Sequence, residues 1–170
     1  MIQRLSLQWV AGVFILLVFP ALAQPSSGLS VSSAWMRATV AGQESAAAYM
    51  TLLTQEKMTL VGVTSTQAAS AVLHEMILEG GVMKMRVQPR LELLPGRTII
   101  LKPGSYHIML SGLKQTLSPG QTFPLTLHME DAMGKPGVLE IRAQVRSLNG
   151  QDMAAERGTA MSGQHHQHMH

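Results

Sequence analysis

The segment VLHEMILEGGVMKMR, residues 72–86, decides the fold because it places two runs of strand-forming residues around the turn Glu79-Gly80-Gly81. Glycine adopts the positive backbone angles of a tight turn at little steric cost. We therefore expect residues 74–78 and 82–87 to pair as a β-hairpin. Side chains alternate between the two faces of a strand, so a slip of one residue would turn Met85 to the wrong face.

Short apolar runs broken by turn residues continue outward from this hairpin in both directions. Pro95-Gly96, Pro103-Gly104 and Pro119-Gly120 are typical breaks. The predicted strands are residues 29–39, 46–53, 59–65, 71–78, 82–88, 97–101, 107–111, 122–129 and 137–145. Strands at such regular spacing, without a long helix or an internal repeat, predict an all-β sandwich or barrel.

Four metal-ligating residues stand at fixed intervals in this pattern. Ten residues lie between His74 and Met85, twenty-one between Met85 and His107, and one between His107 and Met109. Thioether sulfur selects the soft Cu(I) ion, and copper accepts imidazole in either oxidation state. His107 and Met109 are two apart on one strand, so they point to the same face and can reach one ion. The sequence therefore predicts a Cu(I) site with two imidazoles and two thioethers.

Several other histidines and methionines compete with this assignment. Met76 and Met83 share the faces of their neighbours on the hairpin and are alternative sulfur donors. His128 stands alone, with Met129 on the opposite face, so we interpret it as structural or exposed. Methionine also fills irregular gaps in cores, and that is our interpretation of Met36, Met50 and Met58.

The four ligands and their flanking segments resemble the PCu(A)C family of periplasmic copper chaperones. The similar segments are AWMRATVAGQESAAAYMTL (34–52), VLHEMILEGGVMKMR (72–86) and LKPGSYHIMLSGLKQTLSPGQTFPLTLHMED (101–131). The resemblance implies a cupredoxin-like Greek-key β-sandwich over residues 29–147. It also implies delivery of Cu(I) toward the binuclear copper centre of cytochrome c oxidase, received by a respiratory oxidase subunit or its assembly factor.

The first 23 residues have the features of a secretory signal peptide. Arg4 precedes an apolar run from Trp9 to Phe19, and Ala21-Leu22-Ala23 provides a small-residue cleavage site. The run is shorter than the roughly 20 residues that span a bilayer. We expect cleavage near Ala23, a short leader over 24–28, and a mature periplasmic chain without membrane insertion.

Composition excludes several classes of function. The chain has no cysteine, so it cannot be a thiol oxidoreductase, hold a thiolate-ligated copper centre or be lipidated at a cleavage-site cysteine. The formal net charge of +3 falls by one with loss of Arg4, which is too small for a nucleic-acid-binding surface. No catalytic triad, paired acids or phosphate loop is visible, so we expect no enzymatic activity.

The C-terminal residues 148–170 form a second, compositional metal signal. The strand pattern ends near Val145, and the chain closes with His165, His166, Gln167, His168, Met169 and His170. A histidine-rich tract of this kind is typical of metal binding, and imidazole suits Cu(II). We predict a flexible His/Met-rich tail with a second copper site at His165, His166, His168, Met169 and His170. The alternative is the remnant of a purification tag, although Gln167 and Met169 interrupt the histidines.

Two other functions are alternatives to a copper chaperone. A copper-buffering or resistance protein would use the tail and the additional methionines for capacity. A copper enzyme or electron-transfer protein would need a geometry acceptable to both oxidation states, which ligands preferring Cu(I) do not favour.

Overall fold

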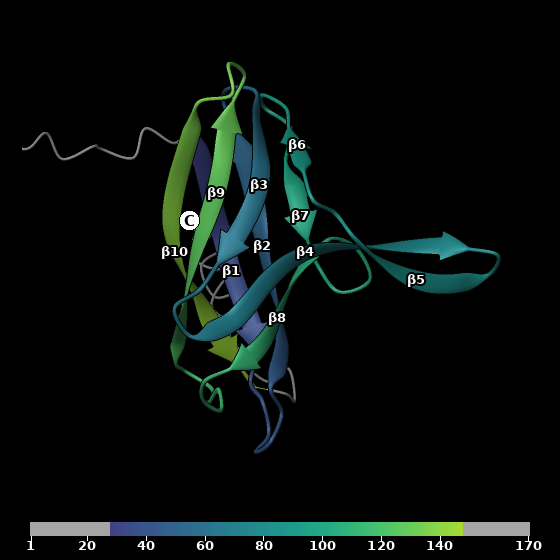
Figure 1. Cartoon of the computed structure of the whole chain (residues 1–170), viewed down its shortest axis with the longest axis vertical. Coiled ribbons are helices and arrows are strands. Elements are labelled where there is room, and N and C mark those ends of the chain that lie inside the picture. Colours follow the sequence, from purple (N-terminus) through teal and green to yellow (C-terminus); the bar gives the residue numbers. More distant parts are fainter. Residues whose placement is uncertain (1–27, 148–170) are drawn as a thin grey trace, which may run out of the picture.

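The computed structural model describes residues 28–147, and they form ten β-strands and no helix (Figure 1). The strands are β1 (Leu29–Arg37), β2 (Ser45–Thr54), β3 (Met58–Thr64), β4 (Ala68–Glu79), β5 (Val82–Val87), β6 (Leu91–Leu93), β7 (Ile99–Leu101), β8 (His107–Leu113), β9 (Thr122–Asp131) and β10 (Pro136–Arg146). The predicted signal peptide, the leader up to residue 27 and the predicted tail lie outside the described residues. Between 28 and 147 no helix exists that could cross a membrane.

Seven of the strands close into a flattened barrel. They follow the order β4, β8, β2, β1, β10, β9 and β3, and β3 returns to β4 through one pair, Val63 with Ala71. β1 runs parallel to β10, whereas the other pairings are antiparallel. In Figure 1, β9 and β3 lie in front of β1 and β2. The predicted all-β fold is confirmed, with the two layers joined edge to edge.

The barrel interior is filled by alternate residues of its strands. In β9 the buried positions are Phe123, Leu125, Leu127 and Met129, each followed by a more exposed residue. This period of two is the signature of a strand with one face on a core. The interpretation of three methionines as core residues is also confirmed, because Met36, Met50 and Met58 are all buried.

β4 is longer than the barrel and extends from it with β5 as an arm. Pairing with β8 covers Ala68 to His74, and pairing with β5 runs from His74 to Glu79. Gly80 and Gly81 have φ of 59° and 78°, as a two-residue hairpin turn requires. The predicted hairpin is therefore confirmed. Figure 1 shows this arm, residues 75–87, reaching sideways away from the barrel.

The predicted strands agree with nine of the observed ones and miss β6. Leu91–Leu93 is only three residues long, too short to show a period, yet it pairs with Met58–Leu60 of β3. The predicted strand over residues 97–101 began too early, since β7 starts at Ile99 rather than Arg97. The bounds of β7 are set by its pairing with β2, which no local sequence pattern reveals.

Candidate metal centre

The two predicted histidine ligands face each other across neighbouring strands. His74 of β4 is paired directly with His107 of β8. Their rings are stacked, with centroids 5.7 Å apart and an interplanar angle of 23°. Thirty-two residues separate the two in the chain, so the β4–β8 ladder is what brings both imidazoles to one place.

A hydrogen bond fixes the orientation of the His107 ring. The residue is buried, and its Nδ1 lies 3.0 Å from the backbone oxygen of Ser105. A carbonyl oxygen can only accept, so Nδ1 carries the proton when this bond is made. Nε2 is then the unprotonated nitrogen, which is the form that binds a metal.

His74 has a ring nitrogen that the protein leaves without a partner. Its Nδ1 is buried and forms no hydrogen bond in the described part of the chain. A buried polar atom without a partner is unfavourable and rare in native structures. A metal ion bound beside the two rings would satisfy such a nitrogen, so this histidine fits the predicted role.

Met109 lies on the same face of β8 as His107. Ile108 and Leu110, on either side of it, are completely buried in the barrel. Alternation therefore turns Met109 and His107 outward from the core. Met109 is half-buried and lies opposite Val72 of β4, two pairs along the ladder from the two histidines.

Met85 belongs to the arm rather than to the barrel wall. Its direct partner is Met76, while His74 is paired with Val87. Met85 is two residues from Val87, so it shares the face of His74 and is its diagonal neighbour, at a typical separation of about 7–8 Å. Its side chain is 51% exposed. The structure thus places the two histidines and Met109 together, and Met85 at the base of the adjoining arm.

A single backbone carbonyl ties the arm to the buried histidine. The oxygen of Ser105 accepts from His107 Nδ1 and also, at 3.3 Å, from the backbone N–H of Met76. One acceptor therefore holds the ring of one predicted ligand and the strand that carries another. No sequence pattern indicates this contact, because it involves a backbone oxygen of a polar loop.

Tyr106 directly precedes His107 in the chain. It packs against the core, and burial raises the pKa of its phenol, with a further increase from the hydrogen bond and negative charge of Glu75. Each of these two residues is the chain neighbour of one of the two histidines. They contribute a neutral phenol and a carboxylate that is already bonded.

The remaining candidates lie elsewhere. His128 bonds Thr64 through Nε2 at 2.8 Å on the β9–β3 wall, in agreement with a structural role. Residues 28–147 contain no group of three or more His, Cys, Asp or Glu that could hold a metal. Methionine sulfur would therefore have to complete any site built on His74 and His107. The predicted tail ligands His165, His166, His168, Met169 and His170 are outside the described residues.

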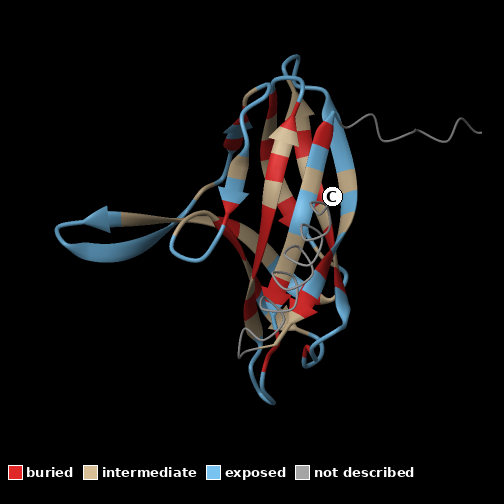
Figure 2. Ribbon diagram, turned by 180° about the vertical axis from the view of Figure 1, so that it is seen from behind, coloured by how far each residue is buried: buried red, intermediate tan, exposed pale blue. Residues whose placement is uncertain are grey.

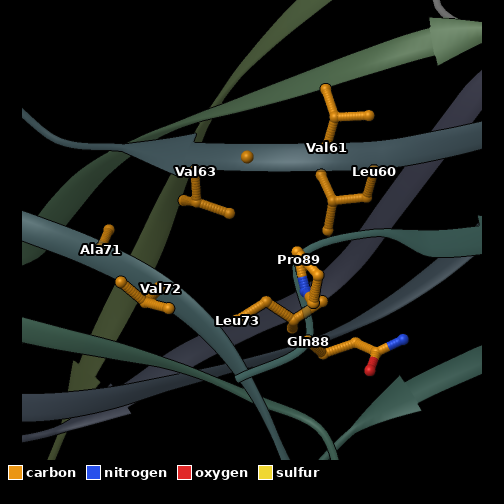
Figure 3. A pocket seen from close by; sticks show the side chains of 9 residues that line it. Leu60, Val61, Val63, Ala71, Val72, Leu73, Gln88 and Pro89 are labelled. Atoms are coloured by element: carbon orange, nitrogen blue, oxygen red, sulfur yellow. The ribbon is translucent and has the colours of Figure 1, made fainter.

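A separate hollow opens where the barrel is weakly closed. It has a volume of about 230 Å³ and lies between β3 and β4, at the edge of β4 opposite β8 (Figure 3). Its lining is apolar apart from Gln88, with Leu60, Val63 and Leu73 facing the space. It contains no imidazole or thioether, so it is distinct from the candidate centre.

Residues 29–162 match the family described as "Putative lipoprotein LpqE-like". A relative from Leifsonia xyli subsp. xyli, named "Putative lipoprotein Lxx21020", is 33% identical over 128 residues, which cover 72% of this chain and 77% of that protein.

Solved PCuAC domains have a similar fold. The apo PCuAC domain from PmoF1 has a TM-score of 0.57 and 26% identity, covering 71% of this chain and 94% of its own. The copper-bound PCuAC domain from PmoF2 has a TM-score of 0.58 and 23% identity, covering 71% and 93%, and this likeness concerns the fold alone. These neighbours fit the family resemblance that the sequence suggested.

Proposed function

Because the chain belongs to the LpqE-like family and folds like PCuAC domains, we propose that it is a periplasmic copper chaperone, not an enzyme. It binds one Cu(I) ion through His74, Met85, His107 and Met109. The observation that carries the proposal is the stacked pair of histidines on adjacent strands, one with an oriented ring and one with a buried nitrogen lacking a partner.

The donor set favours the monovalent ion. Two thioethers select Cu(I), and the two imidazoles accept it. All four ligands are neutral, so the loaded site carries only the charge of the ion. Without an anionic ligand, the metal passes readily to an acceptor that offers thiolates, which is what a carrier requires.

The position of the ligands also suits a carrier. His107 and Met109 are held by the barrel, whereas Met85 is half-exposed on the arm. An acceptor can therefore approach the ion from the side of the exposed thioether, while the barrel holds the other ligands. The ion remains Cu(I) throughout, so transfer needs no electron donor.

The wider role follows from the family resemblance. We propose export through cleavage near Ala23 and delivery toward the binuclear copper centre of cytochrome c oxidase, through an oxidase subunit or its assembly factor. The curated relative is named a lipoprotein, whereas this chain contains no cysteine to carry a lipid. The tail at His165, His166, His168, Met169 and His170 would add a Cu(II) site, and a tail-deleted protein should bind one Cu(II) fewer.

An anaerobic Cu(I) titration against a chromophoric chelator tests the core site. The variants His107→Ala and Met109→Leu should lose the tight equivalent. His128→Ala is the matched control, since that imidazole lies on another wall of the barrel and should leave binding unchanged. Equal affinity in all four proteins would refute the proposed centre.

Deletion of the gene separates delivery from buffering. If the deletion lowers oxidase activity and added copper restores it, the result would support copper delivery to the oxidase. A normal oxidase together with greater copper sensitivity would instead assign the protein to copper buffering or resistance, the alternative that the additional methionines favour.

A further inference from the structure

The arm has two faces of opposite chemistry. One face carries charged residues, where Glu79 Oε2 contacts Lys84 Nζ at 3.0 Å and Arg86 Nη2 at 2.9 Å. The other face carries only apolar and thioether side chains, namely Met76, Leu78, Met83, Met85 and Val87. Figure 2 shows that much of the arm is exposed, so these side chains do not fill a core.

Three of the five residues on this second face are methionines, and the register gathers their sulfur atoms. Met76 lies directly opposite Met85, and Met83 lies diagonally opposite Met76. Such neighbours have Cβ atoms roughly 5 Å and roughly 7–8 Å apart, respectively. Flexible methionine side chains can converge over these separations. The three thioethers can therefore reach one ion.

Packing does not explain this choice of residues. Met83 and Met85 are 47% and 51% exposed, and Figure 1 shows the arm extending away from the strands of the barrel. Exposed apolar side chains in a row are unusual on a soluble protein and indicate a binding role. What methionine offers here and leucine does not is a soft sulfur donor, which selects Cu(I).

We propose that Met76, Met83 and Met85 form a second Cu(I) site, made only of thioethers, that shares Met85 with the core centre. This inference rests on the proposed function for the identity of the cargo. The arm site is more exposed than the core and has one ligand fewer, so it binds copper more weakly. It is the place where copper enters and leaves.

The shared ligand provides a path between the two sites. An ion held by Met76, Met83 and Met85 exchanges its first two sulfur atoms for the imidazoles of the core while Met85 stays bound. Thioethers carry no proton, and the copper remains monovalent, so the exchange releases neither protons nor electrons. The hydrogen bond from Met76 N–H to the Ser105 oxygen keeps the arm beside the core during this step.

The test is an anaerobic Cu(I) titration of the full chain with ¹³C-labelled methionine methyl groups, followed by NMR. In the wild type, the Met109 methyl should shift with the first equivalent, which also occupies the shared Met85. In His107→Ala/Met109→Leu, which lacks the core but keeps the arm, the arm methyls should shift first.

Adding Met76→Leu/Met83→Leu to that background should weaken Cu(I) binding at the arm at least 10-fold in chelator competition. The matched control is Met133→Leu, which removes an 89% exposed methionine from the β9–β10 turn and should have no effect. The tail is identical in all of these proteins, so it cannot produce the difference.

The outcomes separate this inference from the proposed function. Arm methyls that stay unmoved in His107→Ala/Met109→Leu, or an unchanged affinity in the arm variant, would overturn the arm site and leave the core proposal intact. A Met109 methyl that never shifts, together with moving arm methyls, would refute the core centre and support the arm site.

Discussion

Replacing His74 with leucine is expected to stabilise the metal-free protein while abolishing its tight Cu(I) site. The basis is the buried Nδ1 of His74, which has no hydrogen-bond partner in the described part of the chain. An unsatisfied buried polar atom costs about 1–3 kcal/mol. The residue as a whole is only partly buried, so the lower end applies, and a gain of about 1 kcal/mol corresponds to roughly 3 °C in Tm.

His107→Leu is the matched variant because it removes the partner ring. This residue is buried and bonds the Ser105 oxygen through Nδ1, so its loss removes a satisfied hydrogen bond. We expect a loss of about 1 kcal/mol in the metal-free state. The two substitutions thus change apo stability in opposite directions, while both remove the tight copper equivalent.

Copper should reverse the order of stability. A ligand at 100 times its Kd stabilises the folded state by about 2.7 kcal/mol. With Cu(I) bound, the wild type should therefore have a higher free energy of unfolding than His74→Leu, although the variant is the more stable of the two without metal. Anaerobic urea unfolding with and without Cu(I) measures both values.

A single result would refute the reasoning about His74. If His74→Leu destabilises the metal-free protein by 1 kcal/mol or more, as His107→Leu is expected to do, then Nδ1 is already satisfied in solution. The unpartnered Nδ1 would then not be evidence that His74 binds a metal, and the copper titration alone would have to support the centre.

Other substitutions test the frame around the site. Gly112→Ala should lower the free energy of unfolding in urea by about 1–3 kcal/mol, because φ is +63° and an added Cβ would lie 2.6 Å from the Ala69 Cβ. Phe123→Ala should cost about 3–5 kcal/mol in the same assay, since this ring is completely buried. Ultraviolet titration should show Tyr106 ionising above 10, and Glu75→Gln should lower that pKa; an unchanged midpoint would contradict the contact. Because the pKa of Tyr106 is raised in the folded state, the protonated phenol contributes its full stabilisation below about pH 10, and this contribution is lost as the pH rises through the folded-state pKa.

Local patterns in the sequence were sufficient for most of the fold. Alternation along β9 and the glycine pair of the arm each carry their signal within a few residues, so these elements could be predicted. β6 could not, because three residues show no period and their pairing with β3 is formed with residues more than 30 positions earlier.

For the candidate centre too, local sequence patterns predict some features and not others. The spacing of His107 and Met109 alone places both on one face, because strand geometry has a period of two. The face of Met85 follows from the hairpin turn, whereas its direct partner, Met76, is set by the register of the β4–β5 pairing. Nothing local indicates that the Ser105 oxygen would accept from both His107 and the arm.

By itself, the sequence determined which donors the proposed centre has available: two imidazoles and two thioethers at fixed intervals and no thiolate, on strands that alternate in polarity. Only the tertiary structure decided how those donors meet. The β4–β8 ladder stacks His74 on His107, and the extension of β4 beyond the barrel exposes a row of methionines next to them. The physical reason is that side-chain direction follows from local backbone geometry, whereas contact between strands depends on register, which long-range hydrogen bonds and core packing set together.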